Sequence, residues 1–198
     1  MSEVKLKQKV TLKENGEAAP FTFKEKLKIE MGWSSDTDLD LCIFWKTKTG
    51  KEGGVFSNEY TQNMDDLGAL DKFPFIKLCS DPIAPRPGWE CSDQIVVKNI
   101  DALSELYVVF INYNAAIDNI NMTFNEYSGR VEFTTDTGDN FEVPIDSNSG
   151  PVYLVCKIEN SDAGKKAINK GDVLTVGQAF SQIPGFKLIC NETEKEIL

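Results

Sequence analysis

The chain has 198 residues, of which 21 are basic and 31 acidic, so its formal net charge is −10. Such a charge repels nucleic acid and anionic membranes, and it favours cationic or neutral partners, divalent metal ions among them. The chain has no histidine, the commonest general base, and its five cysteines show no CxxC spacing, so neither histidine-based catalysis nor a zinc site is expected.

Residues 1–16 alternate charged with apolar side chains and contain no continuous apolar segment. We therefore expect no signal peptide, a cytoplasmic location and mostly reduced cysteines. The longest apolar run, Leu106–Ile111, is far too short for a transmembrane segment. The length of the chain and the absence of a low-complexity linker predict a single domain over residues 1–198.

Alternation of apolar and polar residues dominates the first half of the chain and predicts β-strands. One stripe comprises Val4, Leu6, Val10 and Leu12, and a second comprises Phe21, Phe23, Leu27, Ile29 and Met31. In the segment GWSSDTDLDLCIFW (32–45), Leu39, Leu41 and Ile43 should point into a core, and Cys42 should be a small buried side chain. The segment NMDDLGALDKF (63–73) is expected to form about two helical turns.

The second half alternates as well. The segment 106–113 is apolar on both faces at first, which predicts a central strand. RVEFTT (130–135) and NFEVPI (140–145) should form a hairpin through the link DTGDN, in which Asp136, Asp139 and Asn140 are typical turn residues with a structural role. Strands are expected at 151–159 and 185–190, and a short helix at 161–170, capped by Ser161 or Asp162. About nine or ten short strands with a few helical turns predict an all-β fold, a two-sheet antiparallel β-sandwich.

Asp36, Asp38 and Asp40 occupy alternate positions at the start of a strand, so their side chains share one face, about 7 Å apart. Each neighbouring pair repels by roughly 2–3 kcal/mol at an effective dielectric of ~20, and by well under 1 kcal/mol in open water. Two interpretations follow. Either calcium, which takes about six to eight oxygen ligands, neutralises the row, or the row is a solvated strand end that discourages edge pairing.

The segment CSDPIAPRPGWECSDQ (79–94) repeats Cys-Ser-Asp around three prolines. Because each proline fixes φ, the loop is stiff, and it carries the carboxylates of Asp81, Glu90 and Asp93. These carboxylates are the candidates for the second side of a cation site, and the loop is equally compatible with a tethered connection between strands. A disulfide between Cys79 and Cys91 is a third reading, which a cytoplasmic location disfavours.

In their order and spacing, these motifs resemble the TerD-type family of tellurite-resistance and general stress proteins. Asp38-Leu39-Asp40 is similar to the family's D-x-D-L-D strand, Asp93-Gln94-Ile95 to the end of its acidic loop, and Tyr113-Asn114-Ala115 to the element that closes the next strand. The segments 124–143 and 173–180 resemble the family's hairpin region and its late VGQ strand. The likeness covers about residues 25–186.

The resemblance implies a β-sandwich with no established enzymatic activity, associated with resistance to tellurite and other chemical stress. It also implies calcium ligands on two sides, from Asp36, Asp38 and Asp40 and from Asp81, Glu90 and Asp93. The loop departs from the family pattern in 84–93, which has Arg86, Trp89, Cys91 and Ser92 where acids are expected. One weakened calcium site, or none, is therefore expected rather than two.

Three classes of function follow from the sequence. The first is a non-enzymatic stress-response protein that binds calcium and has other proteins as partners. The alternative is a metal-free protein-interaction or small-ligand-binding module on the same fold, with Trp89 and the Met64–Phe75 insertion as its surface. An enzyme is the least favoured class, because a carboxylate pair would have to act as acid and base with no residue to orient a nucleophile.

Overall fold

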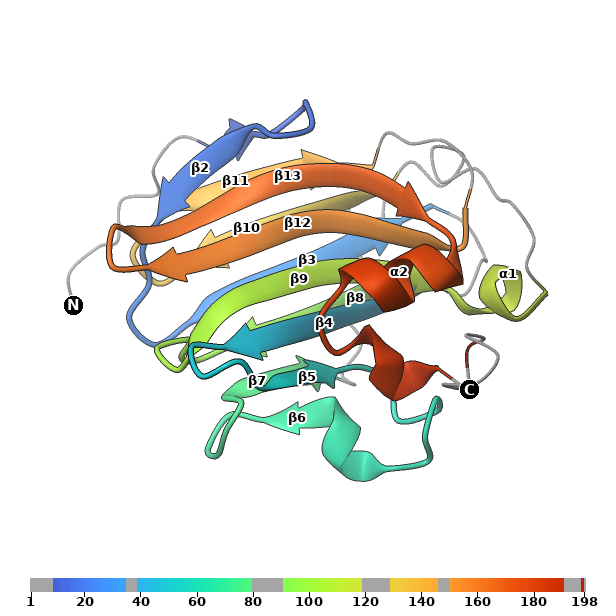
Figure 1. The fold of residues 1–198 in the computed structure, drawn as a ribbon. Coiled ribbons are helices and arrows are strands. Elements are labelled where there is room, and N and C mark those ends of the chain that lie inside the picture. The colour runs from blue at the N-terminus through green and yellow to red at the C-terminus, as the bar shows by residue number, and fades with distance from the viewer. Residues whose placement is uncertain are drawn as a thin grey trace.

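A computed structural model describes residues 9–34, 39–79, 91–118, 129–145, 150–190 and 197. Two sheets pack face to face as a β-sandwich, which confirms the predicted fold class (Figure 1). The seven-stranded sheet has the order β1 (Val10–Thr11), β11 (Asn140–Pro144), β10 (Arg130–Thr135), β3 (Leu27–Trp33), β8 (Cys91–Val97), β7 (Ile76–Cys79), β6 (Gly68–Ala69). The six-stranded sheet has the order β2 (Ala18–Phe21), β13 (Gly164–Leu174), β12 (Val152–Ser161), β9 (Leu103–Asn112), β4 (Leu39–Thr47), β5 (Glu52–Val55). The named strands pair antiparallel, apart from the parallel pairing of β1 with β11.

One apolar cluster fills the space between the two sheets. Leu39, Leu41 and Ile43 of β4 all belong to it, as predicted, and none is more than 2% exposed. Ile29 and Met31 of β3 reach it from the facing sheet. Because side chains alternate along a strand, Asp40 and Cys42 lie on the opposite face of β4.

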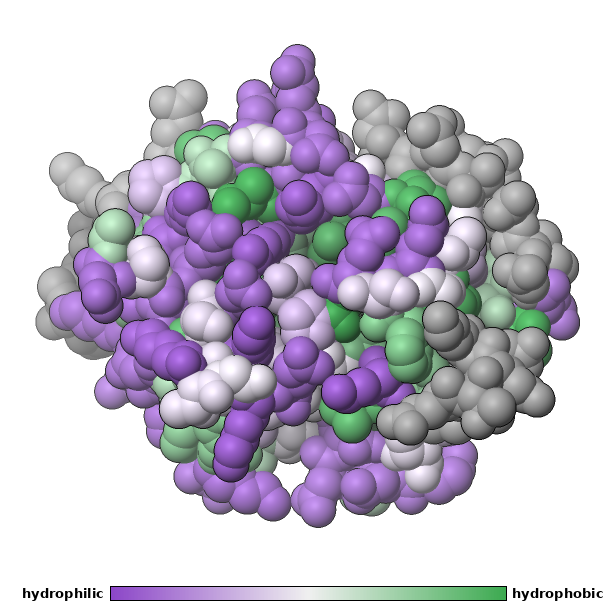
Figure 2. Space-filling model, viewed as in Figure 1, coloured by the Kyte–Doolittle hydropathy of each residue, from purple (hydrophilic) through white to green (hydrophobic). Residues whose placement is uncertain are grey.

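The outer face of the six-stranded sheet is covered too. A second apolar cluster lies there beneath α2 (Val176–Gln182) and the 3₁₀-helix η3 (Phe186–Ile189), and Figure 1 shows α2 lying across this sheet. Cys42 and Phe44 of β4 and Val109 of β9 are buried in it. Strand β9 is therefore a central strand with both faces covered, which explains its continuous apolar run. Figure 2 shows that hydrophilic residues dominate the surface on this side of the molecule.

Several local predictions are confirmed. The hairpin of β10 and β11 forms with Gly138 in its turn at φ +89°. The strand predicted at 106–113 is β9, and it ends one residue early because Tyr113 begins α1 (Tyr113–Asp118). The predicted stripe 21–31 is divided between β2 and β3, which belong to different sheets.

The helix predicted at 161–170 is wrong, because this segment forms the turn of the β12–β13 hairpin and the first part of β13. Gly164, at φ +119°, permits the reversal. The buried positions that follow are Ala167 and Asn169. Since neither is a large apolar residue, the alternation of apolar and polar side chains that marks a strand is weak in this part of the sequence.

The predictions at 173–180 and 185–190 are wrong in part, because helical segments replace strands there. Strand β13 ends at Leu174, and α2 begins with a capping box between Thr175 and Gln178. The last segment is the 3₁₀-helix η3. The helix predicted at 63–73 shrinks to the single 3₁₀ turn η1 (Met64–Leu67), which Asn63 caps.

Several strands begin or stop together at one end of the sandwich. Trp33 pairs with Cys91 in one sheet and Leu39 with Asn112 in the other, and the chain passes from Trp33 to Leu39 within a few residues. Arg130 pairs with both Gly32 and Pro144, which brings β10 and β11 to the same end. The strands that flank 35–38 and 80–90, the segments with the predicted acidic ligands, therefore begin or stop at one end of the molecule.

Candidate cation-binding site

Asp93 links the two sheets at this end. Its Oδ2 accepts a hydrogen bond from the Leu41 N–H at 2.9 Å, although Asp93 belongs to β8 and Leu41 to β4. Strand β5 pairs with β4 only from Ile43 to Lys46. Beyond the end of that ladder, the carboxylate of Asp93 satisfies a backbone donor that β5 does not reach.

Asp40 is held from the other side by a tyrosine. The Tyr60 hydroxyl donates to Asp40 Oδ2 at 2.8 Å. The Tyr60 ring is 5% exposed and packs edge-on against Phe56 and Tyr113, with centroids 6.1 and 5.4 Å away. Burial, followed by electrostatic interactions with Cys42 and Asp40, raises the pKa of Tyr60 well above its ordinary value. The hydroxyl is therefore a neutral donor that fixes one oxygen of Asp40.

A cleft of about 190 Å³ brings both aspartates together. Its lining residues are Asp40, Ser57, Asn58, Leu67, Leu78, Cys79 and Asp93. Two carboxylates, a hydroxyl and an amide form its polar part, while two leucines and a thiol form its apolar part. The polar part is made of hard oxygen donors, the ligand type that calcium and magnesium prefer.

Burial and the nearby carboxylates both affect the pKa of the Cys42 thiol. Cys42 is fully buried, as predicted. Burial raises its pKa well above the ordinary value, and the charges of Asp40 and then Asp93 raise it further. A thiol in this state stays protonated and is inert, so the negative field here favours a cation rather than a nucleophile.

The described residues around the cleft offer oxygen ligands, the type that a hard cation prefers. They supply only part of the coordination shell of a calcium ion. Asp40, Asp93, Ser57 and Asn58 offer side-chain oxygens around the cleft. Calcium takes about six to eight oxygens, so water, carbonyls or other side chains have to complete the shell. Within the described ranges, no cluster of three or more Asp, Glu, Cys or His side chains is placed to hold a metal ion.

Four of the six predicted ligands, Asp36, Asp38, Asp81 and Glu90, lie outside the described residues. The structure places the remaining two, Asp40 and Asp93, on one cleft. The sequence analysis did not identify Ser57, Asn58 or Tyr60, which join them. These three follow β5 and belong to no periodic stripe or motif, so only the fold reveals them.

The other acidic and thiol candidates have structural roles. Asp136 accepts from the N–H groups of Lys24 and Glu25, both at 2.9 Å, and Asp139 accepts from the Thr22 N–H at 2.9 Å. The hairpin turn thus caps the turn between β2 and β3, which confirms the predicted structural role of these aspartates. All five cysteines are free, so no disulfide joins Cys79 to Cys91.

No protein-family model matches the chain, and no curated protein matches it. Among the helices in the described part of the chain, none is long and apolar enough to cross a membrane.

Proposed function

We propose that this chain is a non-catalytic, calcium-binding β-sandwich of the TerD type, with the cation at the cleft between Asp40 and Asp93. The observation that carries the proposal is that these carboxylates, which come from different sheets, line one cleft with Ser57 and Asn58. A cation between them would neutralise two negative charges in a partly buried place. A role in resistance to tellurite or other chemical stress, in the cytoplasm and with protein partners, is part of the same proposal through the family resemblance.

In this proposal, hydrogen bonds orient the carboxylates of Asp40 and Asp93, and four further acidic residues supply additional oxygens. Tyr60 and the Leu41 N–H each occupy one oxygen of a carboxylate, which orients the other oxygen of Asp40 and of Asp93. Asp36, Asp38, Asp81 and Glu90 are the proposed sources of further oxygens, and each is tested by an Asp→Asn or Glu→Gln substitution. The ion would stabilise the junction between the sheets, because its ligands come from both.

Thermal unfolding of chelator-treated protein, followed during titration with calcium, tests the proposal. A ligand that binds only the folded state at a hundredfold excess over Kd stabilises by about 2.7 kcal/mol. For a chain of this size that corresponds to a rise in Tm of roughly 5–10 °C. Asp40→Asn and Asp93→Asn should abolish the rise, while Asp162→Asn in the exposed β12–β13 turn should keep it. No rise at millimolar calcium would exclude the metal.

The apolar part of the cleft favours a second candidate, a binding site for a small ligand. Leu67 and Leu78 form a wall beside the two carboxylates, which suits an organic cation with a short alkyl group. In methyl NMR spectra, n-butylammonium should then shift the Leu67 and Leu78 signals in the absence of calcium. The same titration on Asp93→Asn should give no shift, and unchanged leucine signals in the unmodified chain would exclude this candidate.

A further inference from the structure

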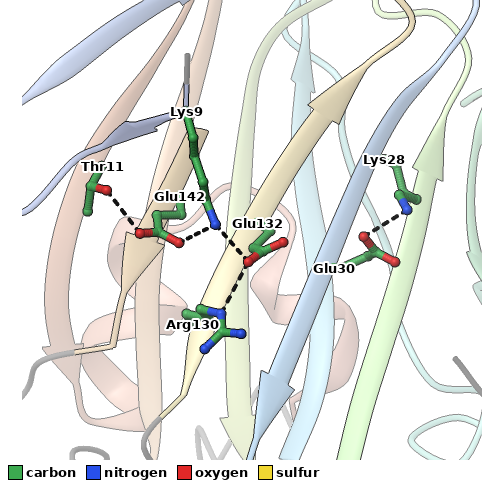
Figure 3. A network of polar contacts seen from close by, with 7 residues as sticks. All are labelled: Lys9, Thr11, Lys28, Glu30, Arg130, Glu132 and Glu142. Carbon is green, nitrogen blue, oxygen red and sulfur yellow. Dashed lines mark hydrogen bonds and ion pairs between the residues drawn. The ribbon is translucent and has the colours of Figure 1, made fainter. Parts of the chain in front are cut away.

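The outer face of the seven-stranded sheet carries three glutamates in a row on adjacent strands. Glu142 of β11 lies opposite Glu132 of β10, and Glu132 lies opposite Glu30 of β3. Like charges directly opposite each other on neighbouring strands destabilise a sheet. The row therefore depends on cations, and Figure 3 shows which residues supply them.

Two of the cations belong to the strands that carry the glutamates. Arg130 Nε lies 3.1 Å from Glu132 Oε1, and Lys28 Nζ lies 2.8 Å from Glu30 Oε2. The third is different, because Lys9 precedes β1 and reaches the sheet from the N-terminal segment. Its Nζ lies 2.8 Å from Glu132 Oε1 and 2.5 Å from Glu142 Oε2, so one ammonium bridges two strands (Figure 3).

Residues 9–12, here termed the N-terminal strap, lie along the edge of the seven-stranded sheet. Strand β1 has two residues at the edge of the sheet, and Val10 is 47% exposed. Thr11 Oγ1 donates to Glu142 Oε1 at 2.9 Å, and the Leu12 N–H donates to the Glu142 carbonyl at 2.9 Å. Leu12 anchors the end of the strap: its side chain is 3% exposed in the core, and its carbonyl accepts from Asn169 Nδ2 at 3.0 Å. A short edge element with so little pairing is the kind that opens locally while the rest of a fold stays intact.

We propose that the N-terminal strap is a charge-operated latch, which Lys9 holds closed on Glu132 and Glu142 and which opens when either partner loses its charge. Closure covers the edge of β11, since β10 occupies its other side. Opening exposes that edge, and an exposed strand edge accepts a further strand. It also leaves Glu142 and Glu132 facing each other without the Lys9 ammonium between them, while Arg130 stays 3.1 Å from Glu132.

The directions of the pKa shifts of Lys9 and Glu132 agree with an ion pair that holds the strap closed. Burial alone would lower the pKa of Lys9, but its bonds to Glu132 and Glu142 outweigh burial and raise that pKa. Burial alone would raise the pKa of Glu132, but Lys9 and then Arg130 outweigh it and lower that pKa. The charged groups that face Lys9 are thus Glu132 and Glu142, with Arg130, Glu30 and Lys28 next along the row. The latch is closed at neutral pH and loses attraction as acid protonates Glu132.

Native-state hydrogen exchange of the full chain at pH 7 and low salt tests the latch at the amides of Val10, Thr11 and Leu12. Lys9→Met should speed their exchange about threefold to tenfold, the range expected for losing a partly exposed double ion pair. Lys9→Arg should restore slow exchange. Lys166→Met is the matched control, because it removes an exposed lysine 2.9 Å from Glu159 on the other sheet, and it should leave the strap unchanged.

Acid and salt give a second readout on the same variants. The ratio of exchange rates between Lys9→Met and the unmodified chain should fall towards one near pH 3 and in about 1 M salt, where the ion pair is lost or screened. The latch is wrong if Lys9→Met exchanges no faster than the unmodified chain at pH 7. It is equally wrong if Lys166→Met has the same effect, or if faster exchange extends through β3 and β9, which would indicate global destabilisation.

Discussion

The carboxylate of Asp93 accepts the Leu41 N–H and also faces the cleft that Asp40 lines. Asp40 in turn accepts from the buried hydroxyl of Tyr60. Each aspartate is therefore oriented by a neutral donor, which leaves its negative charge uncompensated by that contact. Two oriented carboxylates from different sheets are the residue-scale basis of the proposed cation site.

Replacing Asp93 separates its structural from its binding role. Asp93→Ala leaves the Leu41 N–H without its acceptor, and a partly buried unsatisfied donor costs about 1–3 kcal/mol. Asp93→Asn keeps an oxygen acceptor, so it should cost less while still removing the charge. Urea unfolding of chelator-treated protein measures both losses. Equal stability of Asp93→Ala and the unmodified chain would contradict the proposed structural role.

Removing the Tyr60 hydroxyl tests how Asp40 is oriented. Tyr60→Phe keeps the ring between Phe56 and Tyr113 but loses the bond to Asp40, so we expect a loss of about 1–3 kcal/mol, since that bond is made to a charged group. Calcium affinity should also fall, because Asp40 gains rotational freedom. Calorimetric titration checks this, and a variant that binds calcium more tightly would show that Tyr60 competes with the ion.

At the scale of elements, the C-terminal helices act as a third layer on the six-stranded sheet. They bury Cys42 and Phe44 on the face of β4 that also carries Asp40. The layer is fixed by apolar contacts: Phe186 of η3 is fully buried and its ring centroid lies 5.3 Å from that of Phe44. Asp40 is half-buried on this face, where Tyr60 donates to it and the residues after β5 line the cleft beside it.

Two substitutions in η3 measure the contribution of the layer. Phe186→Ala should destabilise the chain by about 3–5 kcal/mol, because it leaves a cavity beneath the helix. Leu188→Ala removes a side chain that is 45% exposed, so its cost should be below about 1 kcal/mol. Chemical denaturation compares the two, and similar losses would show that η3 does not pack as described.

Elements with a strong pattern could be predicted from the sequence, and elements with a weak pattern could not. The β10–β11 hairpin has an acidic glycine turn, and β9 has a long apolar run, so both were predictable. Strand β13 is hard to predict because Asn169 stands at a buried position. Helix α2 is hard to predict because its capping box, Thr175 with Gln178, lies in a segment that resembles a strand.

The residues of the candidate site also divide into those that the sequence predicts and those that it does not. Asp40 and Asp93 were predictable because acidic residues at strand ends are visible in the sequence. Ser57, Asn58 and Tyr60 were not, because their role depends on where the segment after β5 folds back. Local patterns thus located the carboxylates, while long-range packing selected the residues that surround them.

At the scale of the whole molecule, the net charge of −10 makes cations favourable partners. Internal ion pairs compensate part of that charge. Lys157 lies 2.7 Å from Glu105 and 3.2 Å from Glu159, and Lys9 bridges Glu132 and Glu142. These pairs lie on the outer faces of both sheets, whereas Asp40 and Asp93 line the cleft.

Stability should fall as the pH drops below about 4.5. Burial alone would raise the pKa of Glu105 and of Glu132, but ion pairs with Lys157 and Lys9 outweigh it and lower both from 4.5. A carboxyl whose pKa is lower in the folded state stabilises above its unfolded pKa, and that contribution is lost as the pH falls through the folded value. Tm measured from pH 7 to 3 should therefore decline below pH 4.5, and a flat profile would contradict these ion pairs.

The most direct test of the proposed site is anomalous diffraction from crystals grown with calcium. The account predicts a calcium peak at the cleft, with a carboxylate oxygen of both Asp40 and Asp93 at roughly 2.3–2.6 Å from the ion. A lysine or arginine side chain between the two carboxylates, or no anomalous peak there at millimolar calcium, would contradict it.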